Sequence, residues 1–338
     1  MRRFLITLFI FPTILFSQPE QPLLFTNSNS PIPILRSLKT IIPKHNITSL
    51  ATDIKKLNWI GTLDGLICYN GKRWVILNTK NSKLPSNKIL CIETENNTKY
   101  IGTTEGLLII KNNNWEIYTT KNSKLPSNRI RKILIKDSVV WIATSEGLVK
   151  YSNGFEVMLS ENKNGILDDD FISMNIDDDG ILWLGTNSGL YSFKNNIWRV
   201  FTTKNSPLPN NNIWNIVVDG QNRKWIGTKE GIATLFENEW VVFDKKNTPL
   251  KTNTIRSIAY DDYDRIWVAT EKEILSYDGG DWKKQKTKIC KKEAITSLFI
   301  DDFDNKWMCT SRNIIVYNSE GVEFKNNSTN ESSVVVSK

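Results

Sequence analysis

The sequence predicts an all-β protein, a seven-bladed β-propeller made of four-stranded antiparallel blades. Three observations lead to this fold class. A motif with a nearly constant spacing occurs seven times, each copy divides into four short apolar runs, and no helical pattern joins one copy to the next. With 40% hydrophobic and 10% aromatic residues, the 338-residue chain can bury a large core.

The repeat is anchored by an aromatic residue, and successive anchors stand 40 to 42 residues apart. A constant period of this length indicates one supersecondary unit that is repeated. A Thr stands three residues after every anchor, and a Gly stands six residues after the first five. The anchors are Trp59, Tyr100, Trp141, Trp183, Trp225, Trp267 and Trp307.

The fifth copy shows the predicted strands most clearly. Its apolar runs are rich in Ile, Val, Trp and Phe and are separated by turn residues, which is typical of strands. Asp and Asn suit the first turn because their side chains bond nearby backbone amides, and Gly suits the second because it adopts positive φ. The four runs are Ile213–Val218, Lys224–Thr228, Gly231–Phe236 and Glu239–Phe243.

A single four-stranded sheet of this kind exposes apolar residues on both faces, so the copies are expected to stack around an axis. The anchor Trp and the Trp of each fourth strand would fill the space between blades; the latter are Trp74, Trp115, Trp198, Trp240 and Trp282. Two segments compete for the last outer strand position. We favour Leu23–Thr26 near the amino terminus over Gly321–Phe324.

The expected organisation has four parts. Residues 1–17 have the charged start, apolar centre and small-residue end of a signal peptide, so a periplasmic or secreted location is expected, with no membrane span after cleavage. Residues 18–45 form a lead-in that contains the closing strand. Residues 46–325 form the propeller, and 326–338 form a polar tail.

The string from Trp59 to Trp74, which reads Trp-Ile-Gly-Thr-x-x-Gly-Leu-x-x-Tyr-x-Gly-x-x-Trp, resembles the two-component regulator propeller repeat. This resemblance implies the exported sensory part of a hybrid histidine-kinase regulator, with a sensor kinase as a possible partner. The last two copies depart from the pattern, since Glu273 and Asn313 replace the turn Gly. The sequence shows neither a second set of repeats nor a kinase core, so we expect a stand-alone propeller.

The residues give little support for catalysis, a cofactor or a metal. The one His, His45, lies in the lead-in, and activation of a Ser or Cys nucleophile by His would depend on it. The acidic segments Asp168–Asp170 and Asp177–Gly180 lack the closing Glu of a calcium loop and are interpreted as turns. The four Cys are expected as buried small side chains, although disulfides remain an alternative; they are Cys68, Cys91, Cys290 and Cys309.

Binding residues are expected where the copies differ, on the face formed by the blade connections and the turns between second and third strands. Near the start of the inner strand, the positions aligned with Ile89, Ile130 and Ile172 carry Trp214, Arg256, Thr48 and Thr296. An aromatic ring beside a guanidinium can stack on a sugar ring or another planar group. The turns supply Asp64, Glu105, Glu146 and Glu230. Packing within the channel and a solvated rim are the alternatives.

The favoured hypothesis is a non-enzymatic recognition or sensor module that binds a glycan, a peptide or a partner protein. The alternatives are an enzyme of the polysaccharide lyase or lactonase type and a structural or assembly protein. Nucleic acid is not an expected partner, because the formal net charge of +8 is spread over the copies rather than gathered on one face.

Overall fold

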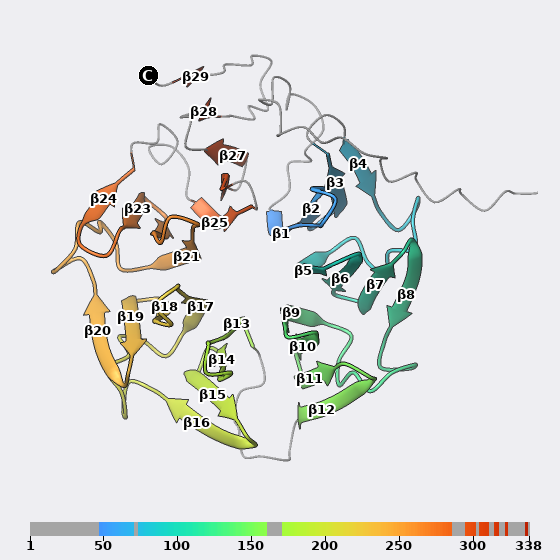
Figure 1. The fold of residues 1–338 in the computed structure, drawn as a ribbon, viewed down its shortest axis with the longest axis horizontal. Helices are drawn as coiled ribbons and strands as arrows, with labels where there is room; N and C mark the ends of the chain where they lie inside the picture. Colours follow the sequence, from blue (N-terminus) through green and yellow to red (C-terminus); the bar gives the residue numbers. More distant parts are fainter. Residues whose placement is uncertain are drawn as a thin grey trace, which may run out of the picture.

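The sheets of the protein surround a central axis, as the computed structural model shows (Figure 1). It describes residues 47–70, 74–160, 171–285, 295–301, 304–310, 314–317, 322–323 and 335–336. No helix, and so no helical candidate for a membrane span, occurs among these residues. The predicted all-β propeller architecture is therefore correct in class.

In every sheet the strands follow one another in chain order, from the innermost strand outward. The innermost are β1 (Ile47–Thr52), β5 (Ile89–Glu95), β9 (Ile130–Lys136), β13 (Ser173–Ile176), β17 (Ile213–Val218), β21 (Ile255–Tyr260) and β25 (Ile295–Ile300). The second strands are β2 (Asn58–Thr62), β6 (Thr98–Thr103), β10 (Val139–Thr144), β14 (Leu182–Gly185), β18 (Lys224–Thr228), β22 (Ile266–Thr270) and β26 (Lys306–Thr310).

The two outer positions follow in chain order. Third strands are β3 (Gly65–Tyr69), β7 (Leu107–Lys111), β11 (Gly147–Tyr151), β15 (Leu190–Lys194), β19 (Gly231–Phe236), β23 (Ile274–Tyr277) and β27 (Ile314–Tyr317). Outer strands are β4 (Trp74–Leu77), β8 (Asn114–Tyr118), β12 (Phe155–Ser160), β16 (Ile197–Phe201), β20 (Glu239–Phe243), β24 (Trp282–Lys284) and β28 (Val322–Glu323). A further strand, β29 (Val335–Val336), pairs with β28. The four strands predicted for the fifth copy are β17–β20, residue for residue.

The prediction of seven four-stranded blades is wrong. Within the described residues, six sheets have four strands and are called blades 1–6, from β1–β4 to β21–β24 in chain order. The last sheet, β25–β29, has five strands and is called the closing sheet. It differs because β29 pairs with β28, with Val322 opposite Val336 and Glu323 opposite Val335, and so covers the edge that the outer strand of each blade leaves unpaired.

The edge beside β27 is the position for which the sequence offers two candidate strands. Residues 322–323 of Gly321–Phe324 form β28 there, with Glu323 opposite Tyr317. The favoured segment Leu23–Thr26 lies outside the described residues, as do the signal peptide and the rest of the lead-in. Residues 335–336 of the expected polar tail form β29.

The core lies between neighbouring sheets. Trp59, Trp225, Trp267 and Trp307 are almost fully buried, and Trp183 and Tyr100 are also buried, whereas Trp141 is half-buried. In the fourth strands Trp115 is buried, and Trp198, Trp240 and Trp282 are half-buried; the side chain of Trp74 is outside the described set. Apolar side chains of blade 1 and the closing sheet, including Ile47 and Trp307, pack together and close the ring.

The turn between second and third strands explains the recurring Thr and Gly. In blade 5, Thr228 Oγ1 donates to the Gly231 carbonyl at 2.8 Å and accepts from the Glu230 amide at 3.0 Å. Gly231 has φ +131°, and a Cβ there would lie 2.8 Å from the Phe243 carbonyl oxygen. Only Gly fits both restrictions, because an L side chain rarely adopts this backbone conformation.

Three of the four cysteines are free and buried: Cys68, Cys91 and Cys309. Burial raises the pKa of each of these thiols to about 12. The expectation of buried, reduced side chains is confirmed for these three, while Cys290 lies outside the described residues.

Replacing Trp225 by Ala should lower the free energy of unfolding by roughly 3–5 kcal/mol. Its indole is fully buried and lies 5.7 Å from the Phe243 ring and 5.5 Å from the Tyr277 ring, centroid to centroid. Urea unfolding followed by fluorescence measures the loss. The control is Val241→Ala on the same blade, where the side chain is 51% exposed and a change within about 0.5 kcal/mol is expected. Equal losses in the two variants would contradict the role assigned to the anchor.

Candidate functional site in the bulge ring

All the innermost strands except β13 carry a β-bulge close to the end at which the chain enters the sheet. In blade 5, Ile213 pairs with Thr228 and Asn215 with Gly227, so Trp214 has no partner in the ladder. A bulge adds one residue to a strand and turns its side chain away from the regular direction. The residues at this position are Thr48, Leu90, Arg131, Trp214, Arg256 and Thr296, with Ile172 at the equivalent place just before β13, and we call this set the bulge ring.

The register corrects two positions of the sequence alignment. Ile89 and Ile130 are fully buried and pair with the turn Thr of their own blades, so Leu90 and Arg131 stand in the bulge ring instead. Sequence reasoning missed Arg131. Aligning the copies on the buried Ile that opens the inner strand would have found it, because that Ile recurs in blades 1, 2, 3, 5 and 6 and in the closing sheet.

Trp214 and Arg256 meet across the interface between blades 5 and 6. The Arg256 guanidinium carbon lies 5.1 Å from the centroid of the Trp214 ring, and the guanidinium also pairs with the carboxylate of Glu271. Glu271 belongs to the turn after β22, so the bulge residue reaches the turn of its own blade. The structure therefore joins these two predicted site residues in one cluster, with Trp214 half-buried and Arg256 exposed.

The two threonines of the bulge ring are used in the scaffold. Thr48 Oγ1 donates to the Ile89 carbonyl of blade 2 at 2.8 Å. Thr296 Oγ1 donates to the Cys309 carbonyl of its own sheet at 3.1 Å. Because each hydroxyl already donates its one proton to a backbone carbonyl, it can only accept a hydrogen bond from a ligand.

The acidic turn residues are exposed but not gathered. Asp64, Glu105, Glu146 and Glu230 stand in blades 1, 2, 3 and 5, and the backbone amide of each donates to the preceding turn Thr at 3.0–3.1 Å. They form an acidic rim on separate blades. No group of three or more His, Cys, Asp or Glu in the described part of the chain is placed to hold a metal ion.

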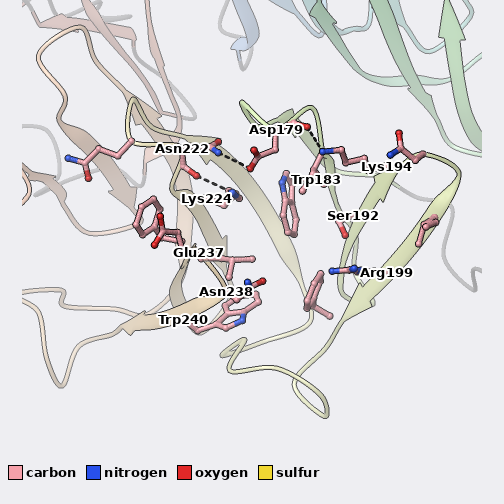
Figure 2. Close-up of a pocket in the computed structure, with 17 residues that line it drawn as sticks. Asp179, Trp183, Ser192, Lys194, Arg199, Asn222, Lys224, Glu237, Asn238 and Trp240 are labelled. Carbon is pink, nitrogen blue, oxygen red and sulfur yellow. Dashed lines mark hydrogen bonds between the residues drawn. The ribbon is translucent and has the colours of Figure 1, made fainter.

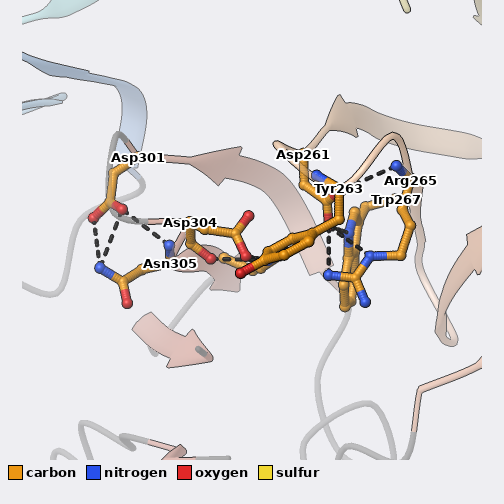
Figure 3. A network of polar contacts seen from close by, with 8 residues as sticks. Asp261, Tyr263, Arg265, Trp267, Asp301, Asp304 and Asn305 are labelled. Carbon is orange, nitrogen blue, oxygen red and sulfur yellow. Dashed lines mark hydrogen bonds and ion pairs between the residues drawn. The ribbon is translucent and has the colours of Figure 1, made fainter. Parts of the chain in front are cut away.

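The acidic turns between first and second strands, at the other end of the sheets, are structural. Trp267 Nε1 donates to Asp261 Oδ2 at 2.7 Å, and Arg265 pairs with the same oxygen at 2.9 Å (Figure 3). Asp261 Oδ1 accepts from the amides of Tyr263 and Arg265. Asp177 belongs to one of the segments considered for calcium, and its carboxylate likewise accepts a hydrogen bond from Trp183 Nε1 at 2.8 Å. The other segment, residues 168–170, lies outside the described residues.

The chain carries a repeat of the two component regulator propeller family, because residues 249–272 match the model of that family. The resemblance expected from the repeated Trp-Ile-Gly-Thr string is thereby confirmed. A search of the curated proteins found no match to this sequence.

Solved structures share the fold at low sequence identity. The extracellular domain of a hybrid two component system protein from B. thetaiotaomicron superposes with a TM-score of 0.69 at 19% identity, covering 87% of this chain and 44% of that chain. The chain thus spans less than half the length of that extracellular domain. A catalytically inactive histidine-to-alanine variant of virginiamycin B lyase from Staphylococcus aureus superposes with a TM-score of 0.63 at 13% identity. The match covers 81% of this chain and 94% of the lyase chain. The structure of YCF48 bound to D1 peptide superposes with a TM-score of 0.62 at 13% identity, covering 80% of this chain and 91% of the YCF48 chain.

Replacing Asp261 by Asn should destabilise the fold at neutral pH by about 1–3 kcal/mol, because an amide nitrogen would face the donors of Trp267 and Arg265. Burial alone would raise the pKa of Asp261, but the hydrogen bonds from Trp267 and Arg265 outweigh it and lower that pKa. A lowered carboxyl pKa contributes stability above its ordinary value of about 4, and this stability is lost as the pH falls through the folded-state value.

The difference between wild type and the Asn variant should therefore shrink in acid. Urea unfolding at neutral pH and at several pH values below 4 measures it, with exposed Asp262→Asn as the matched control. A difference that stays constant with pH would contradict the role of the carboxylate charge.

Proposed function

We propose that this chain is the recognition part of an exported sensor, located in the periplasm or secreted. The family repeat at residues 249–272 and the fold shared with the extracellular domain of a two component system protein support a sensory role. The signal-peptide pattern of residues 1–17 supports export. A sensor kinase is the proposed signalling partner.

The cluster of Trp214, Arg256 and Glu271 carries the proposal. Its half-buried aromatic ring and exposed guanidinium are held next to each other by their contact across two blades and by an ion pair within blade 6, so little ordering entropy is lost when a ligand binds. Neighbouring bulge-ring hydroxyls and the acidic rim provide hydrogen-bond acceptors. A glycan, a peptide or a loop of a partner protein would bind here by stacking and hydrogen bonding.

Recognition without catalysis fits the residues better than the lyase alternative does. The lyase that shares the fold loses activity when a histidine is replaced. In this chain the one His is His45, which precedes β1 and lies outside the described residues. The proposed role therefore rests on binding alone.

Trp214→Ala should weaken binding of a ligand found by a glycan and peptide screen by at least about tenfold, equivalent to 1.4 kcal/mol. Thermal stabilisation identifies the ligand, and calorimetry measures its affinity. Tyr263→Ala is the matched control, because Tyr263 is an exposed aromatic residue in a turn at the other end of the sheets, also placed against an arginine. Unchanged affinity in Trp214→Ala, or no stabilising ligand for the wild type, would refute the proposal.

A further inference from the structure

A cleft of about 950 Å³ lies between blades 4 and 5, away from the bulge ring (Figure 2). Two rows of cross-strand neighbours face each other across it. Blade 4 contributes the row Trp183, Ser192 and Arg199, and blade 5 contributes the row Lys224, Leu235 and Trp240. Its volume is within the range of small-molecule sites in proteins.

Comparison with the next interface explains why the space exists. In blade 6 the position of Leu235 is occupied by Tyr277, as the register of the strands shows. The Tyr277 ring lies 5.5 Å from Trp225 of blade 5 and 4.9 Å from Trp282 of its own blade, so it fills the interface between blades 5 and 6. Leu235 is smaller and has no ring, which leaves the equivalent place between blades 4 and 5 without an aromatic side chain.

The same position is aromatic in blade 4 and aliphatic in blade 2. Phe193 of blade 4 lies 6.2 Å from Trp141 and 4.5 Å from Trp198. Blade 2 has Ile110, but there the neighbouring Trp115 is only 9% exposed and packs into the apolar cluster between blades 1 and 2. In blade 5, Trp240 stays half-buried, so its ring remains available at the wall of the cleft.

Three aromatic rings line the vacant place. Phe201 lies 5.8 Å from Trp183 and 5.7 Å from Trp240, centroid to centroid. Rings prefer offset or edge-to-face partners at such separations. A ligand ring that enters beside Leu235 would therefore find the surroundings that Tyr277 has in the next interface.

The charges of the cleft differ in whether they are already paired. Lys224 Nζ pairs with the buried Asp177 carboxylate at 3.1 Å, and Lys194 Nζ donates to the Asp179 carbonyl at 2.7 Å. Arg199 has no hydrogen-bond or ion-pair partner within the described ranges, and its side chain lines the cleft next to Ser192. Glu237 lies across the cleft from Arg199 in Figure 2. An unpaired guanidinium is a suitable partner for one carboxylate, which it binds bidentately.

We propose that this cleft binds an aromatic carboxylate, either a free aromatic acid or a peptide that ends in an aromatic residue. The ring takes the place left by Leu235 among Trp183, Phe201 and Trp240, and the carboxylate pairs with Arg199. This site is separate from the bulge ring and goes beyond the recognition role proposed above.

The deciding variant is Leu235→Tyr, which gives blade 5 the residue that blade 6 has. Calorimetry with phenylacetate, indole-3-acetate and the tripeptide Ala-Ala-Phe tests the wild type and the variant. Saturable binding by the wild type and at least a tenfold loss in Leu235→Tyr are expected, together with an unchanged or higher Tm because the new ring fills the cleft. Whether the free acids or the tripeptide bind more tightly identifies the source of the ligand.

Additional variants and probes separate a loss of binding from a loss of folding, and separate this proposal from the proposed function. Arg199→Gln changes an exposed side chain and should reduce binding at least tenfold, and phenylacetamide should bind the wild type correspondingly more weakly than phenylacetate. Leu235→Met keeps the ring-sized space and should retain binding, as should Trp214→Ala in the bulge ring. The proposal is overturned if no probe binds the wild type with a Kd below about 1 mM, or if Leu235→Tyr binds as well as the wild type.

Discussion

The bond between a buried Asp and the indole of the anchor Trp is the contact on which most of the sheets depend. It occurs in blades 1, 4, 5 and 6 and in the closing sheet, at 2.7–3.0 Å, and joins the first hairpin turn to the ring that fills the space between sheets. A carboxylate buried here would be costly without several donors. Backbone amides of the turn and, at three interfaces, a Lys of the following sheet supply them, as for Lys99 with Asp53 at 3.0 Å. The same contact thus fixes a turn, a ring and a neighbouring sheet.

Blades 2 and 3 are built without this bond. The position six residues before the anchor is Thr94 in blade 2 and Ile135 in blade 3, and neither side chain has a carboxylate to accept hydrogen bonds. Apolar packing holds this interface instead, with Tyr118, Tyr151 and Phe155 in ring contact at 4.7–6.3 Å. Because each sheet contacts only its neighbours, one interface can change its chemistry while the others keep theirs. This freedom allows binding sites to arise without loss of the ring.

The two proposed sites use this freedom in different ways. In the bulge ring, Trp214 and Arg256 have no partner residue in the ladder, so these side chains can vary without cost to pairing. In the cleft, Leu235 replaces an aromatic residue that the next blade uses for packing, so binding space is gained from the core itself. The cluster of Trp214, Arg256 and Glu271 is already assembled by its own contacts, whereas the cleft offers an unpaired Arg199 and three ring faces.

The sequence alone determined the strands, the turns and the family of the repeat. The strands β17–β20 follow residue for residue from apolar runs and turn residues, because strand ends depend on neighbours in the chain, and the roles of Thr228 and Gly231 are local in the same sense. Only the tertiary structure decided the five-stranded closing sheet, the place of Arg131 in the bulge ring and the cleft beside Leu235. Each depends on pairing or packing between segments far apart in the sequence: β29 pairs with an edge, a bulge shifts the register by one residue, and a cavity exists only where two blades face each other.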